Sequence, residues 1–165
     1  MNKTLHLTLF LGVVCAIAGA GLSFVNSFTA PKIAENEMAG VKATLEMVYP
    51  GGEFTAVDFV DDTGLVAEVY QEASNGYIFK MNGMGYNTNG FTYMVAINND
   101  GAVDAFVALE QNETSGFGAR CFTDEYTSQL IGQSDNFPTL SGASLTSGSI
   151  VKGLDAAKAV FESLK

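Results

Sequence analysis

The sequence predicts an α+β domain that follows a single N-terminal transmembrane helix. An uncharged, largely apolar run comes first, between Lys3 and Lys32. Alternating strand patterns occupy the middle of the chain, and a helical stripe of apolar residues closes it. We therefore expect a short N-terminus at 1–4, a membrane span at 5–28 and one folded domain at 33–165.

The span at 5–28 is long enough to cross a bilayer. As a helix it would reach roughly 36 Å, against a hydrocarbon core of about 30 Å. A cleaved signal peptide is the next interpretation, but its apolar region is shorter, about 7–15 residues. A lipoprotein signal ending at Cys15 would place a small residue before the cysteine, where Val14 stands. We favour an uncleaved anchor.

Composition excludes several classes of protein. With 47% hydrophobic and 16% charged residues, the chain is not intrinsically disordered. Residues 33–165 carry eighteen acidic and six basic residues, a net charge of −12, which argues against nucleic-acid binding through phosphate neutralisation. The chain has two cysteines and one histidine, and His6 lies in the apolar run. We therefore expect no metal site and no catalytic residue.

Helices are predicted at both ends of the folded domain. Apolar residues recur at helical spacing over 33–49, where Pro50 and the two glycines after it end the pattern. This helix is expected to continue from the membrane span, with a kink or break at Pro31. The final helix follows the stripe Ile150, Leu154, Ala157, Phe161 and Leu164, and Thr146 or Ser147 is expected to cap its start.

Strands are predicted between these helices. The expected strands lie at 65–70, 77–81, 91–98 and 102–109, and a short helix follows at 122–131. The last two strands form a hairpin around the turn sequence Asn98-Asn99-Asp100-Gly101. Alternation along 91–98 predicts that one face of that strand is more buried than the other.

The segment 140–147 carries the clearest chemical signal. It reads LSGASLTS and places hydroxyls and small residues at the start of a helix. Unpaired N–H groups and the helix dipole make such a place suitable for a phosphate. An ordinary Ser/Gly loop with a capping hydroxyl has the same pattern, and spacing alone favours that simpler interpretation.

This segment resembles the S/T-G-A-T/S pattern at which flavin transferases attach FMN to a hydroxyl through a phosphodiester. That pattern marks the covalent-flavin subunits of two respiratory complexes. They are the G subunit of the Rnf complex (ion-translocating ferredoxin:NAD oxidoreductase) and the C subunit of the sodium-translocating NADH:quinone reductase. The attachment position falls on Ser144, where most members have Thr, and Pro138 stands where the family often has Asp.

Other stretches carry the same resemblance in the same order. They are 31–36, 48–54, the GMGY of 83–86, and the ETSGFG of 113–118, which is similar to the family's ETPGLG. In the last stretch Ser115 replaces the usual Pro, and Phe117 replaces the usual Leu. The short length and single anchor favour the Rnf protein over its counterpart in the quinone reductase.

The resemblance implies a covalent-FMN electron carrier with its domain outside the cytoplasm and its N-terminus inside. It would pass electrons between subunits of a complex that exports Na⁺ or H⁺, and it would not be catalytic alone. Its partners would be the other membrane and iron–sulfur subunits, with a flavin transferase for maturation. The residues implied in cofactor binding are Ser144 as the attachment point, with Ser141, Gly142, Ala143, Thr146, Glu113, Thr114, Gly116, Phe117 and Gly118. A cofactor-free anchored binding module is the rival from another class.

For several residues the sequence leaves two interpretations open. Phe117 either contacts the flavin or plugs the core, and Glu113 either contacts the flavin or is a solvated surface charge. Arg120 and Lys152 are candidate phosphate partners, and for Lys152 a solvated helix face is the alternative. Cys121 is either a reactive thiol beside Arg120 or a buried inert one. Nearby acids are expected to lower the flavin potential, because they disfavour a negatively charged reduced form.

Overall fold

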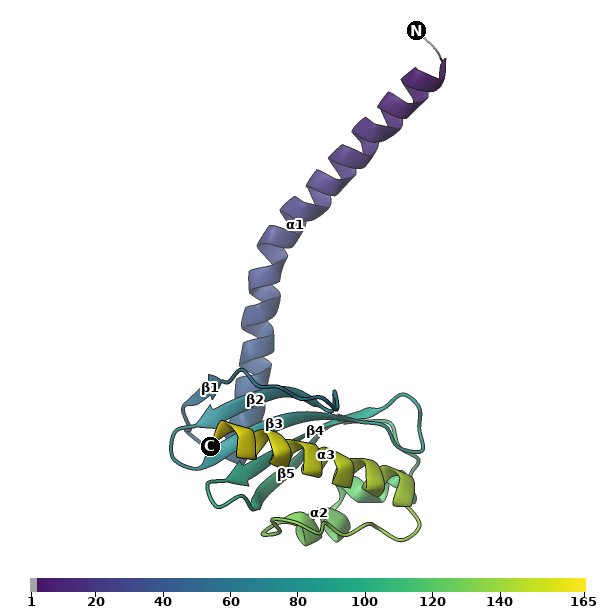
Figure 1. The fold of residues 1–165 in the computed structure, drawn as a ribbon. Coiled ribbons are helices and arrows are strands. Elements are labelled where there is room, and N and C mark those ends of the chain that lie inside the picture. The colour runs from purple at the N-terminus through teal and green to yellow at the C-terminus, as the bar shows by residue number, and fades with distance from the viewer. Residues whose placement is uncertain (1–2) are drawn as a thin grey trace. The chain divides into compact units, whose positions relative to one another are not determined.

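The computed structural model describes residues 3–165, without the side chains at 4, 5, 7, 22 and 24–39. Two compact units are distinguished, divided between Thr44 and Leu45. The first unit consists of most of helix α1, which runs over Lys3–Val48 (Figure 1). The second unit, Leu45–Lys165, holds the folded domain and confirms the α+β class.

Helix α1 includes both N-terminal segments that were predicted as helices. It continues through Pro31, so the predicted helix break is not observed. The predicted span at 5–28 lies within α1, but the side chains at 5, 7, 22 and 24–28 are outside the described residues. Within the part of the chain that the structure describes, no helix is both long and apolar enough to cross a membrane.

The domain is built on a five-stranded antiparallel sheet in which each strand pairs with the next in the chain. The strands are β1 (Phe54–Ala56), β2 (Val66–Glu72), β3 (Gly76–Gly83), β4 (Phe91–Asn98) and β5 (Val103–Gln111). The four predicted strands are confirmed, and three of them extend further than predicted. Short β1 was not predicted, because three residues carry no detectable alternation.

The predicted β4–β5 hairpin turn is confirmed in detail. The Asn98 side-chain oxygen accepts hydrogen bonds from the backbone N–H groups of Asp100 and Ala102, each at 3.0 Å. Gly101 has a φ of 87°, a conformation that a residue with a Cβ adopts only with strain. The local sequence therefore fixes this turn, although the register of β4 on β5 shifts twice beyond it, between Ala96 and Ile97 and between Thr92 and Tyr93.

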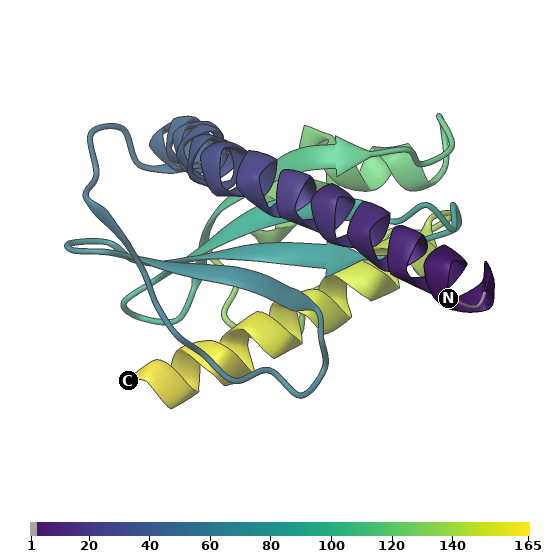
Figure 2. The same cartoon turned by 90° about the horizontal axis from the view of Figure 1, so that it is seen from above.

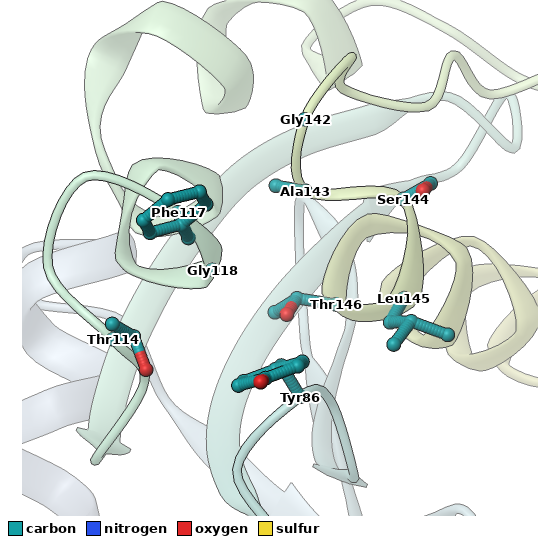
Figure 3. A pocket seen from close by; sticks show the side chains of 9 residues that line it. All are labelled: Tyr86, Thr114, Phe117, Gly118, Gly142, Ala143, Ser144, Leu145 and Thr146. Carbon is teal, nitrogen blue, oxygen red and sulfur yellow. The ribbon is translucent and has the colours of Figure 1, made fainter.

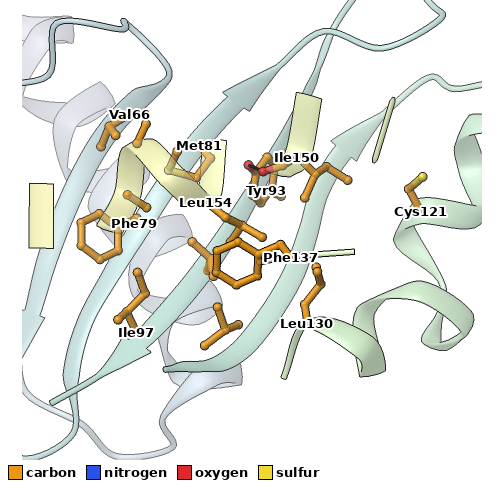
Figure 4. Packing of buried hydrophobic residues seen from close by; sticks show 14 of the residues in the cluster. Val66, Phe79, Met81, Tyr93, Ile97, Cys121, Leu130, Phe137, Ile150 and Leu154 are labelled. Carbon is orange, nitrogen blue, oxygen red and sulfur yellow. Dashed lines mark hydrogen bonds between the residues drawn. The ribbon is translucent and has the colours of Figure 1, made fainter. Parts of the chain in front are cut away.

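Helix α3 (Ser144–Leu164) packs along one face of the sheet (Figure 2). Its predicted stripe is confirmed, since Ile150, Leu154, Ala157 and Phe161 are all buried. These residues join Phe79, Met81, Tyr93, Ile97 and others in the main core (Figure 4). The short helix α2 (Asp124–Leu130) adds Tyr126 and Leu130 to this core.

Strand β4 has one face that is more buried than the other, as predicted, but the difference is confined to the ends of the strand, where Thr92 and Asn98 are half-buried. Tyr93, Val95 and Ile97 point into the main core, while Met94 and Ala96 alternate with them and are 1% and 0% exposed. The middle of a central strand is buried on both sides when both faces of the sheet are covered. The alternation in the sequence did not reveal that the face of Met94 and Ala96 is covered as well.

Two glycines of α3 provide a test of this packing. A methyl group at Gly153 would overlap the hydroxyl of Tyr93, whereas one at Gly148 would meet no atom within 4 Å. Both substitutions to Ala improve helix propensity by about 1 kcal/mol. We expect Gly148→Ala to raise the free energy of unfolding, and Gly153→Ala to lower it by about 1–3 kcal/mol through overpacking. Urea unfolding of the full chain measures both, and an increase in both variants would contradict the described packing.

Candidate functional site

A pocket of about 350 Å³ opens at the N-terminal end of α3. Three segments far apart in the sequence form its wall. These are the β3–β4 loop, the loop from β5 into the 3₁₀ helix η1 (Gly118–Phe122), and the start of α3 with the residues before it. Figure 3 shows the lining residues, which are Tyr86, Thr114, Phe117, Gly118, Gly142, Ala143, Ser144, Leu145 and Thr146.

Most of the residues implied by the sequence resemblance meet in this pocket. Seven of the ten line it, and the three that do not are Ser141, Glu113 and Gly116. Ser141 and Gly116 are exposed nearby in the chain, while Glu113 is buried behind the wall. Two lining residues were missed as site residues. Tyr86 ends the GMGY stretch, and Leu145 directly follows Ser144.

The loop before α3 is fixed by its own hydrogen bonds. The Ser147 hydroxyl donates to the carbonyl oxygen of Ala143 at 2.9 Å and accepts from the N–H of Leu140 at 3.0 Å. The N–H of Ala143 donates to the carbonyl of Leu140, and Gly142 has a φ of 82°. This part of the chain is therefore a tight turn that leads directly into the helix.

The predicted helix cap is wrong. Helix α3 begins at Ser144, so its N-cap is Ala143, and no side chain caps it. Thr146 and Ser147 lie inside the first turn, where their hydroxyls bond to other groups. The N–H groups of a first helical turn lack intrahelical acceptors, and here that turn lines the pocket. Such a turn suits a phosphate.

The four hydroxyls of segment 141–147, all of which the structure describes, have different environments. Thr146 and Ser147 are 1% and 0% exposed, and both donate hydrogen bonds inside the protein. Ser141 is exposed but does not line the pocket. Ser144 alone among the four is exposed and lines the pocket. Of these four hydroxyls, that of Ser144 is therefore the best placed to meet a phosphate in the pocket.

Glu113 joins the three segments of the pocket wall. Its Oε2 accepts a hydrogen bond from the Thr146 hydroxyl at 3.0 Å, and its Oε1 accepts one from the backbone N–H of Asn87 at 3.1 Å. The side chain is 8% exposed, so the interpretation as a solvated surface charge is wrong. Glycines at 85 and 118 allow this junction, because a Cβ at either would lie 2.6 Å from the Thr146 oxygen.

The rim of the pocket exposes large apolar side chains. Tyr86 is 70% exposed, Leu145 66% and Phe117 60%. Phe117 is therefore not a core plug, which removes one of its two interpretations. Exposed rings around a cavity are suited to a planar, largely apolar ligand that covers them.

The predicted phosphate partners do not line the pocket. Arg120 forms a forked ion pair with Glu125, in which Nε donates to Oε2 at 3.0 Å and Nη2 donates to Oε1. Its Nη1 donates to the carbonyl of Ser141 at 3.4 Å, so Arg120 holds the loop before α3. Lys152 is exposed on α3. A phosphate in the pocket would therefore depend on the helix start.

Cys121 is a buried, inert thiol rather than a reactive one. It is 0% exposed, and its Sγ donates to the carbonyl of Ala143 at 3.9 Å. Burial, and next the negative charge of Glu113, raise the pKa of this thiol to about 11. Since the thiolate is the nucleophile, Cys121 is a poor nucleophile at neutral pH.

Comparison with known proteins agrees with this geometry. Residues 85–159 match the FMN-binding domain family, a range that contains every residue lining the pocket. The chain is also 25% identical to the G subunit of the Na(+)-translocating ferredoxin:NAD(+) oxidoreductase complex of Acetobacterium woodii. The alignment covers 96% of this chain and 91% of that protein.

The predicted resemblance to the G subunit of the Rnf complex is confirmed. It extends beyond the FMN-binding match into the N-terminal half of the chain. The pocket fits FMN on three observations: a helix start for the phosphate, an exposed hydroxyl beside it, and exposed rings for the flavin. Both the match and the pocket therefore support FMN as the ligand.

Proposed function

We propose that this chain is a covalent-FMN electron carrier of an Rnf-type ferredoxin:NAD⁺ oxidoreductase complex. The proposal depends above all on Ser144, because of the two exposed hydroxyls in the motif it is the one that lies in the pocket wall. The FMN-binding match and the similarity to the Acetobacterium woodii protein support the same function. FMN would supply the redox chemistry, by accepting and releasing electrons.

Different residues of the pocket would bind different parts of the cofactor. The first turn of α3 would hold the phosphate, whose remaining negative charge the helix dipole stabilises. Tyr86, Phe117 and Leu145 would cover the faces of the ring and exclude water from them. Gly142 and Ala143 present no bulky side chain, so the phosphate could approach the backbone there.

Attachment would join Oγ of Ser144 to the phosphorus of the FMN moiety. The FMN group would come from a flavin dinucleotide, FAD, whose pyrophosphate bond breaks so that AMP leaves with the bonding electron pair. The proton of the Ser144 hydroxyl passes to water, and a flavin transferase would catalyse the exchange. A tethered cofactor stays at a permanently high effective concentration, which matters for a domain outside the cytoplasm, where released FMN is lost by dilution.

We further propose that residues 5–28 anchor the chain in the cell membrane, with residues 1–4 cytoplasmic and the domain at 33–165 extracytoplasmic. The absence of charged residues between Lys3 and Lys32 supports the anchor, and the resemblance to the Rnf subunit supports its orientation. The other membrane and iron–sulfur subunits of the complex would be its partners, and electron flow through them would drive export of Na⁺ or H⁺. The name of the relative, which belongs to a Na⁺-translocating complex, supports that coupling.

One fractionation experiment tests cofactor and location together. The chain is produced with the flavin transferase, and membranes are washed at high salt and run on a denaturing gel. We expect a flavin-fluorescent band near 17.4 kDa in the membrane pellet, with an intact mass raised by one FMN less one water. An unmodified mass in mature material contradicts the covalent cofactor, and a fluorescent band in the wash contradicts the anchor.

A further inference from the structure

The carboxylate of Glu113 lies directly behind two residues of the pocket wall. It accepts a hydrogen bond from Thr146, and a Cβ at Gly118 would overlap its Oε2. Both Thr146 and Gly118 line the pocket, whereas Glu113 does not. Because Gly118 has no side chain, little more than backbone separates this carboxylate from the cavity.

No cation neutralises this carboxylate among the residues that the structure describes. The described ion pairs of the folded domain join Lys80 to Glu68 and Arg120 to Glu125. Glu113 instead receives its hydrogen bonds from neutral groups, a hydroxyl and a backbone N–H. Neither donor carries a positive charge, so these bonds do not pair the carboxylate with a cation.

The negative charge of Glu113 acts over a longer distance than a surface charge would, because the carboxylate is buried. Coulomb interactions grow as the effective dielectric constant falls, and Glu113 is 8% exposed. Cys121 already responds to it, since the Glu113 charge is one cause of the raised pKa of that thiol. A cofactor on the other side of Gly118 and Thr146 would be exposed to the same field.

We infer that Glu113 lowers the reduction potential of the flavin in this pocket, acting through the wall without touching the cofactor. This inference rests on the proposed function. When the ring takes two electrons from a reductant and one proton from water, it gains one negative charge. A fixed negative charge nearby disfavours that product. If the ring takes a second proton, the product is neutral, so the effect of Glu113 should increase with pH.

Glu113→Gln removes the charge while keeping the contacts of the junction. The amide oxygen accepts from the N–H of Asn87, and the amide nitrogen donates to the hydroxyl of Thr146, which can accept as well as donate. Glu162→Gln is the matched control. Glu162 is exposed on α3, eighteen residues after Ser144 and so about 27 Å along the helix. At that distance salt screens its charge.

The experiment measures midpoint potentials of the full flavinylated chain by dye-equilibrated reduction. At a potential where half of the wild-type flavin is reduced, we expect the ratio of reduced to oxidised flavin in Glu113→Gln to rise by on the order of tenfold. Glu162→Gln should match the wild type. Equal potentials in Glu113→Gln and wild type, with FMN attached to both, overturn the inference. An absence of FMN on the wild-type chain overturns the proposed function instead.

A second measurement needs no variant, in case Glu113→Gln fails to fold. Surface acids are screened at 1 M salt, whereas a buried charge is screened much less. We expect the wild-type flavin to remain below free FMN in potential at both 0.1 M and 1 M salt. A wild-type potential that rises to that of free FMN at 1 M salt assigns the effect to surface acids and overturns the inference.

Discussion

We expect Ser144→Ala to produce a chain that carries no covalent flavin. The substitution removes the oxygen that would form the phosphodiester and changes little else, because Ser144 is exposed and lies in the first turn of α3. The other hydroxyls of the first helical turn do not replace it, since those of Thr146 and Ser147 are buried and already hydrogen-bonded. Fluorescence of the denatured band should fall to background, and the intact mass should equal that of the bare chain.

Ser141→Ala is the matched control for this loss. It removes an equally exposed hydroxyl three residues earlier, while the backbone carbonyl that accepts from Arg120 remains. We expect Ser141→Ala to keep its covalent flavin. Fluorescence that persists in denatured Ser144→Ala, or disappears in Ser141→Ala, would show that the attachment point is assigned to the wrong residue.

The elements that the sequence predicted are those with a local period. The stripe from Ile150 to Phe161 places one helix face in the core, and the Asn98–Gly101 turn sets the β4–β5 hairpin. Both signals lie within a few residues of the structure that they produce. The motif residues from Gly142 to Ser144 reach the pocket for the same reason, because the end of one local turn and the start of α3 bring them there.

What the sequence did not reveal depends on contacts between distant segments. Glu113 is buried because Asn87 and Thr146, 26 and 33 residues away, converge on its carboxylate. The same contact takes the Thr146 hydroxyl away from capping the helix. Tyr86 is recognisable as a pocket residue only after the β3–β4 loop lies beside α3. No sequence pattern within a single segment predicts these contacts between distant segments.

Gly118→Ala should both destabilise the domain and reduce its flavin content. The new methyl would overlap Oε2 of Glu113 and lie 2.6 Å from the Thr146 hydroxyl. The φ of Gly118 is not in the left-handed region, so the cost comes from this contact rather than from backbone strain. Since the carboxylate is buried and hydrogen-bonded on both oxygens, it must give up a bond to move. We expect a loss of about 1–3 kcal/mol in the free energy of unfolding, measured by urea titration.

A double-mutant cycle separates this contact from a general defect. In a Glu113→Ala background the carboxylate is gone, so a methyl at 118 no longer overlaps Oε2, although its approach to the Thr146 hydroxyl remains. Gly118→Ala should then cost clearly less than it does in the wild type, and the coupling energy should be about 0.5–3 kcal/mol. Additive effects would mean that Gly118 and Glu113 do not meet in solution. If the double variant also carries more flavin than Gly118→Ala alone, the contact between these two residues affects both the stability of the domain and cofactor attachment. The shape of the pocket would then depend on this junction.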